Sequence, residues 1–336
     1  MVCRRRWRLL AVFLVAISPA LASGATAPSL PAAAAAMKSA KGRDAIKIRE
    51  DVLAAAPADP APRDKFAGEV DAAFRPLLVD PNPDCRLNTA ILFGRLDTLS
   101  LDKALMEALA SKDSSVRYWG AKGLGGPTIS SKLVKVGATA VITALDKAAK
   151  AETSNEVQVQ ILHALVKYEN LDDILDSLES VANHMATDVP NMNCLDEVAA
   201  ALKWVKGHIS GAPNPQKERA ATIAARLASF AAQQQMESKA ITGSIPPSFT
   251  KSTLDVVNSA VGVLATGGAA GAGLSDTSSP EMTLISVNAL VGFDGRPGDL
   301  QKSLPKVAPP PKVGAATPST TPATTSTAPG TPTTAH

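Results

Sequence analysis

Histidine and cysteine side chains are the first candidates for metal binding or nucleophilic chemistry in this sequence. The histidines stand at positions 163, 184, 208 and 336, and the cysteines at 3, 85 and 194. Zinc sites that can be read from sequence use H-E-x-x-H or C-x-x-C spacings, and neither spacing occurs. His184, Asp188, Cys194 and Asp196 lie close together in the sequence but match no metal-site template. We therefore expect no metal and no other cofactor.

Glycine-rich segments and one aromatic cluster are the remaining candidates for catalysis. Residues 120–126 lack the G-x-x-x-x-G-K-[ST] phosphate loop and are interpreted as a helix end, and residues 267–273 lack G-x-G-x-x-G. Arg117, Tyr118 and Trp119 could form an unrecognised active site, but we expect the two aromatic rings to pack between helices. The sequence predicts that the protein is not an enzyme and has no small-molecule substrate.

Acidic side chains are concentrated in one stretch of the chain. Residues 111–150 carry seven basic and two acidic side chains, residues 151–200 carry one and ten, and residues 201–251 carry seven and two. The densest part of the acidic stretch, called the acidic belt below, consists of Asp172, Asp173, Asp176 and Glu179. We predict that the acidic belt binds a protein partner with a basic surface. The alternative is a set of solvated helix faces that aid solubility.

The first 22 residues have the three parts of a secretory signal peptide. Four arginines between positions 4 and 8 precede an apolar run from Leu9 to Ile17, and Ala20-Leu21-Ala22 supplies a small-x-small cleavage site. Cleavage would leave 30 basic against 31 acidic side chains, a balance that argues against nucleic-acid binding. We predict export to the periplasm, the extracellular space or the cell envelope.

Two further segments are expected to lack packed structure. Residues 23–60 read as a flexible leader that contains one helix, from about Arg43 to Ala56. Residues 305–336 contain eight prolines, nine threonines and no acidic residue, a composition that cannot bury enough apolar surface to offset the entropy of ordering. We predict a disordered tail there, which is either a glycosylated stalk or inert.

Between these ends, apolar residues recur at helical spacing. The composition is 45% hydrophobic but only 4% aromatic, which favours helices over a β-sandwich. Val116, Val157 and Val198 are each 41 residues apart, and each begins a run with apolar residues on one helical face. A single helical hairpin of this size cannot bury its own apolar stripe. We therefore predict four consecutive hairpins and a fifth that pairs residues 215–235 with 252–264.

The segment Leu105-x-x-Ala108-Leu109-x-x-x-Asp113-x-x-Val116-Arg117-x-x-x-Ala121-x-x-Leu124-Gly125 resembles the HEAT-like repeat signature of the PBS-lyase type. Arg86 matches Arg117 one unit earlier, whereas Gln158 and Ala199 replace the arginine in later units. The resemblance implies an all-α fold, a right-handed α-solenoid of about four to five HEAT-like hairpins over residues 61–266. It further implies structural roles for four residues, with the aspartate and arginines bracing neighbouring hairpins: Arg86, Asp113, Val116 and Arg117.

The stacked arrangement has consequences for the remaining features. Cys85 and Cys194 would lie about 25 Å apart, whereas a disulfide needs Cα atoms within about 7 Å, so we expect two unpaired thiols. Residues 256–274 carry no charge, but their glycines and polar residues argue against a membrane span. Over residues 267–304 we expect a glycine-rich loop and a short capping helix.

The predicted function is that of an exported protein-binding scaffold, because repeat arrays expose long surfaces for binding. The alternative is a noncatalytic accessory subunit of an envelope enzyme or of a membrane-associated complex.

Overall fold

The computed structural model describes residues 29–187, 195–269 and 271–314. These residues form helices, and the β-type pairing among them is one isolated bridge between Phe293 and Arg296, so the all-α prediction is confirmed. The α-helices are α1 (Leu30–Ser39), α2 (Arg43–Ala54), α3 (Pro60–Phe74), α4 (Pro83–Leu96), α5 (Asp102–Leu109), α6 (Ser114–Leu124), α7 (Pro127–Val136), α8 (Thr139–Ala151), α9 (Asn155–Lys167), α10 (Leu171–Thr187), α11 (Leu195–His208), α12 (Asn214–Thr242), α13 (Pro247–Gly267), α14 (Pro280–Val291) and α15 (Leu300–Ser303). Short 3₁₀ helices occupy Arg75–Val79, Leu99–Leu101 and Ile209–Gly211.

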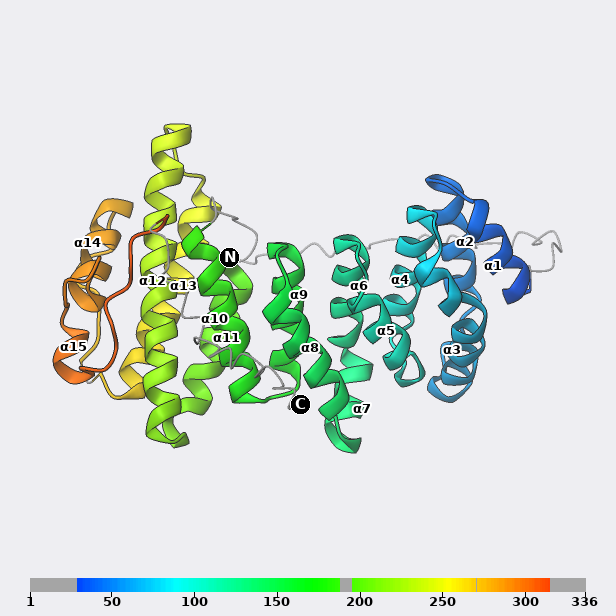
Figure 1. Ribbon diagram of the computed structural model, residues 1–336, viewed down its shortest axis with the longest axis horizontal. Coiled ribbons are helices and arrows are strands. Elements are labelled where there is room, and N and C mark those ends of the chain that lie inside the picture. The colour runs from blue at the N-terminus through cyan, green and yellow to red at the C-terminus, as the bar shows by residue number, and fades with distance from the viewer. Residues whose placement is uncertain (1–28, 188–194, 270, 315–336) are drawn as a thin grey trace, which may run out of the picture.

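The helices pair along the chain, and the pairs stand side by side in an elongated row (Figure 1). Six pairs are present among the described residues: α1/α2, α3/α4, α5/α6, α8/α9, α10/α11 and α12/α13. The second helices contact one another in the order α2, α4, α6, α9, α11, α13 and form one layer. In the other layer α5, α8, α10, α12 and α14 contact one another in turn. One hydrophobic core runs between the two layers along the row.

Proline marks where many of these helices begin. It occupies the first or second helical position of α1, α3, α4, α7, α12, α13 and α14. Proline suits these positions because its fixed φ is helical and its missing N–H would have no partner in the helix. Asn82 and Ser279 add side-chain caps to α4 and α14 by accepting the N–H groups of Asp84 and Met282.

The valines that defined the 41-residue spacing lie in the first turns of α6, α9 and α11. Val116, Val157 and Val198 are at most 1% exposed. Each anchors its second helix in the core between the layers, which is the role that the spacing predicted. The fifth pair is also confirmed, although α12 and α13 are both longer than the segments expected.

The prediction of a flexible leader is wrong for residues 30–39, which form a helix that the sequence analysis did not expect. The alanine-rich run that follows Pro31 forms α1 and buries Ala33, Ala34 and Met37. Alanine has the highest helix propensity, and α1 gains a packing partner in α3. The helix expected from Arg43 to Ala56 is present as α2. The row of helix pairs therefore begins earlier than residue 61.

The helix end expected at residues 120–126 is confirmed, because α6 ends at Leu124 and Gly125 follows as its C-cap. A further helix, which the sequence analysis did not predict, follows directly. Pro127 begins α7, whose first N–H groups are capped by Asp97 from the loop after α4. The Asp97 carboxylate accepts the N–H of Thr128 at 3.0 Å and that of Ile129 at 3.2 Å. This contact spans 31 residues, and local spacing therefore did not predict it.

The predicted disordered tail is wrong for its first ten residues. Val307 is fully buried, the N–H of Val313 donates to Gln233 of α12, and the N–H of Gly314 donates to the carbonyl of Ala186 in α10. The segment 305–314 is therefore held by hydrogen bonds to α12 and α10. The predicted signal peptide and residues 315–336 lie outside the described residues.

Candidate functional site

The acidic belt lies on α10 between α8 and α12. Asp176 contacts Lys150 of α8 at 2.9 Å and Arg219 of α12 at 2.5 Å, and Glu179 contacts Arg219 at 2.6 Å. Burial alone would raise the pKa of Asp176, but the hydrogen bonds from Lys150 and Arg219 outweigh it and lower that pKa. Asp176 and Glu179 thus form an ion-pair network that links three consecutive helices of one layer.

The other two belt residues differ from this pair. Asp172 is exposed and accepts a hydrogen bond from Gln216 at 2.6 Å. The pKa of Asp173 is raised, first by burial and then by the nearby carboxylates of Asp146 and Asp176. Since two of the four belt carboxylates already have cationic partners within the protein, the negative charge offered to a partner comes mainly from Asp172 and Asp173.

Two arginines at matching positions brace successive helix pairs. Arg86 of α4 donates from Nη1 to the carbonyls of Asp80 and Pro81, six and five residues earlier, and from Nη2 to Asp113 at 2.8 Å. Arg117 of α6 repeats the pattern, with Nη1 donating to the carbonyls six and five residues earlier. Each arginine thus caps its own hairpin loop and reaches the carboxylate before the next second helix.

The carboxylate that Arg117 reaches is Glu152, which the sequence analysis missed. Arg117 donates from Nε and Nη2 to the two Glu152 oxygens, at 2.7 Å each, and Glu152 also accepts the N–H groups of Thr153 and Ser154. Burial alone would raise the pKa of Glu152, but the bonds from Arg117 and Ser154 outweigh it, so the pKa is lowered. Glu152 lies in the loop before α9, and Asp113 lies in the loop before α6. This equivalent position is the sequence signal that could have identified Glu152 as the partner of Arg117.

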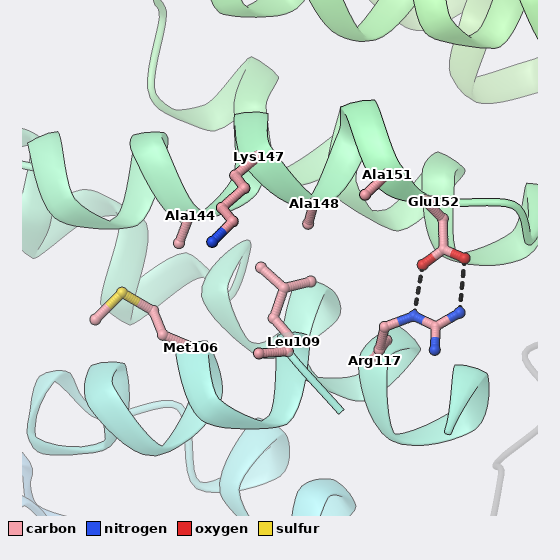
Figure 2. Close-up of a pocket in the computed structure, with 9 residues that line it drawn as sticks. Met106, Leu109, Arg117, Ala144, Lys147, Ala148, Ala151 and Glu152 are labelled. Carbon is pink, nitrogen blue, oxygen red and sulfur yellow. Dashed lines mark hydrogen bonds and ion pairs between the residues drawn. The ribbon is translucent and has the colours of Figure 1, made fainter. Parts of the chain in front are cut away.

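A groove of about 580 Å³ lies between α5 and α8, beside this ion pair (Figure 2). Met106, Leu109 and Ala110 line it from the α5 side, and Ala144, Lys147, Ala148 and Ala151 line it from α8. The Arg117–Glu152 pair lies at one end. The lining is mostly apolar, and the opposite charges of the ion pair neutralise each other, so the groove presents apolar surface with one lysine.

The aromatic residues beside Arg117 have a packing role. The Tyr118 and Trp119 rings meet edge to face with centroids 5.8 Å apart, and the ammonium of Lys122 lies 4.6 Å from the Trp119 centroid. A Cβ added at Gly94 would lie 3.3 Å from the Trp119 ring, which shows how closely α4 approaches it. Arg117 is paired with Glu152. The side chains of Arg117, Tyr118 and Trp119 therefore brace α6 against its neighbours.

The four residues that lie close together in the sequence, His184, Asp188, Cys194 and Asp196, are only partly among the described residues. Asp188 and Cys194 lie outside them, and His184 holds its Nδ1 3.1 Å from the Ser180 carbonyl. The described part of the chain contains no group of three or more His, Cys, Asp or Glu side chains that could hold a metal. None of its helices, α13 included, is long and apolar enough to cross a membrane.

Cys85 is buried in α4 as a free thiol, and Cys194 lies outside the described residues. Burial, with a smaller contribution from Asp80, raises the pKa of Cys85 to about 11. At pH 8 only about one thiol in a thousand is then the reactive thiolate. We expect iodoacetamide at pH 8 to leave Cys85 unmodified in the native protein and to modify it in denaturant, measured by peptide mass spectrometry. Rapid native modification would contradict this burial.

Comparison of the chain with protein-family models gave no match, and a search of curated proteins found no similar sequence.

Proposed function

We propose that the protein is an exported binding scaffold, a right-handed HEAT-like α-solenoid that holds a protein partner along its helix faces. The observation that carries the proposal is the repeated arginine brace, Arg86 to Asp113 and Arg117 to Glu152, which joins successive helix pairs in one register. Units joined in this way stack side by side, and each layer keeps one face toward solvent. A long surface of this kind suits an extended protein partner.

The signal-peptide features of residues 1–22 support export to the periplasm, the extracellular space or the cell envelope. The acidic belt supports a partner with a basic surface, with Asp172 and Asp173 as its contact residues. Asp176 and Glu179 contribute indirectly, because their pairs with Lys150 and Arg219 hold α8, α10 and α12 in one layer.

The test is affinity capture from an envelope extract with the mature chain, residues 23–336, at about 50 mM and about 500 mM salt. Surface charge interactions are screened at the higher concentration. We expect a partner that is captured at low salt, and Asp172→Lys with Asp173→Lys should reduce its recovery about tenfold. Mass spectrometry measures recovery, and circular dichroism should show unchanged helix content.

The matched control reverses two exposed acidic residues at the other end of the array, Asp44→Lys and Glu69→Lys. It makes the same change in net charge, and we expect recovery to stay within about twofold of the unsubstituted protein. Equal loss in both variants would show that only net charge matters and would reject the belt as the site. The absence of any salt-dependent partner would reject the belt-mediated scaffold.

A further inference from the structure

We propose that the groove between α5 and α8 binds an acidic amphipathic helix of a partner protein. Two large apolar side chains, one helical turn apart, enter the groove, and an Asp or Glu of the same helix pairs with Lys147. The inference rests on the proposed scaffold function and names the chemistry of a partner segment at a second surface, distinct from the acidic belt.

The apolar part of the argument comes from the lining. Leu109 is buried at the base, Met106 is half-buried beside it, and Ala144 and Ala148 form the α8 wall without side chains large enough to fill the space. A volume of about 580 Å³ lies within the range of protein sites that enclose ligands. The groove is therefore large enough for more than one partner side chain.

The dimensions favour a helical occupant. The α8 wall runs from Ala144 to Ala151, eight residues whose first and last Cα atoms are about 10 Å apart along the helix axis. Apolar side chains one turn apart on a helix are separated by about 6 Å, so two of them fit within this length. A helix laid in an apolar groove with anchors at this spacing is a common mode of peptide recognition.

Lys147 supplies the charge that selects the partner. The neighbouring cations are already paired, Arg117 with Glu152 and Lys150 with Asp146 and Asp176. Lys147 is exposed at the groove, and among the described residues no carboxylate lies within ion-pair distance of it. An acidic group on the partner would therefore find an available cation directly beside the apolar surface.

The two ends of the chain do not match this chemistry. Residues 1–28 and 315–336 contain no Asp or Glu, and the C-terminal segment has no apolar side chain larger than those of alanine and proline. Charge complementarity with Lys147 and apolar anchoring at Leu109 therefore favour a segment of another protein.

A display library of 16-residue peptides tests the proposal. The library is selected on the mature protein, and the dissociation constants of the enriched peptides are measured by fluorescence anisotropy. We expect enriched sequences to carry two large apolar residues three or four positions apart and an Asp or Glu on the same face. Ala148→Trp should weaken their binding at least tenfold by filling the groove.

Charge variants provide the second measurement. Lys147→Glu should weaken binding about tenfold at low salt, and the difference should shrink at high salt. Lys203→Glu is the matched control, because Lys203 is also exposed but lies on α11 in the other layer, and it should change binding less than twofold. Circular dichroism checks that each variant retains its helix content.

The outcomes separate the groove from the scaffold function. If envelope capture yields a partner but no peptide is sensitive to Ala148→Trp, the scaffold stands and the groove assignment is wrong. If neither capture nor selection yields a binder, both are wrong. Laurate is tested against the same two groove variants, Ala148→Trp and Lys147→Glu. If both variants weaken laurate binding and no peptide binds in this way, the occupant is a fatty-acid anion and the helix assignment is overturned.

Discussion

Gly120→Ala is expected to lower the free energy of unfolding by about 3 kcal/mol, at the upper end of the cost of overpacking a close-packed interior. Gly120 lies inside α6 where it crosses α5, and a Cβ there would be 2.5 Å from the Leu109 nitrogen and 2.9 Å from the Leu105 oxygen. Both atoms belong to the backbone of α5, so no side-chain rotation can relieve the contact. The two helices would have to move apart.

Urea unfolding followed by circular dichroism measures this effect. The matched control is Gly68→Ala in α3, where a Cβ meets nothing within 4 Å. There alanine should stabilise the protein by about 0.5–1 kcal/mol, because it removes backbone freedom from the unfolded chain and favours the helix. Equal urea midpoints for Gly120→Ala and the unsubstituted protein would contradict the close approach of α5 and α6.

Glu152→Ala is the second substitution with a large expected effect, a loss of about 3 kcal/mol. Removing one partner of a buried ion pair leaves the other charge uncompensated, at a typical cost of about 3–5 kcal/mol. The Glu152 side chain is 1% exposed and that of Arg117 is 20% exposed. Because water reaches Arg117 in part, we expect a loss of stability at the lower end of this range. The substitution also removes the acceptor for the N–H groups of Thr153 and Ser154 before α9.

One further variant separates the contribution of charge from that of hydrogen bonding at Glu152, and a second variant is the exposed control. Glu152→Gln keeps an oxygen that can accept the loop N–H groups, so its loss should be smaller than that of Glu152→Ala. Glu69→Ala, on the exposed face of α3, should change stability by less than about 0.5 kcal/mol. If Glu152→Ala behaved like Glu69→Ala in urea unfolding, the brace between the two helix pairs would not contribute to stability.

The pH dependence of the same pair follows from the lowered pKa of Glu152. Its folded pKa lies below the value in the unfolded chain, so the ionised carboxylate contributes stability above the unfolded value. That contribution is lost as the pH falls through the folded pKa. Unfolding measured from pH 7 down to pH 3 should therefore show a steeper loss for the unsubstituted protein than for Glu152→Gln.

The Arg117–Glu152 pair also links stability to the proposed binding groove. It lies at one end of the groove between α5 and α8 (Figure 2) and joins α6 to the loop before α9. Loss of the pair would remove the contact that holds this end of the groove together. The groove variants at Ala148 and Lys147 leave the pair intact, and their effects on binding are therefore separable from effects on stability.

The sequence by itself determined the helical class and most of the helix pairs. Regular spacing of apolar residues specifies which face of each helix must be buried, and Val116, Val157 and Val198 are buried as that spacing requires. The resemblance to the HEAT-like signature implied that Arg86 and Arg117 brace hairpins, and each arginine donates to a carboxylate beyond its own helix pair.

Only the tertiary structure decided how the units meet. Arg117 pairs with Glu152, 35 residues away, and Lys150 and Arg219 neutralise half of the acidic belt. The packing of residues 305–314 likewise depends on α10 and α12. These contacts join segments far apart in the chain, so they depend on the relative placement of whole helices, which local spacing and composition do not encode.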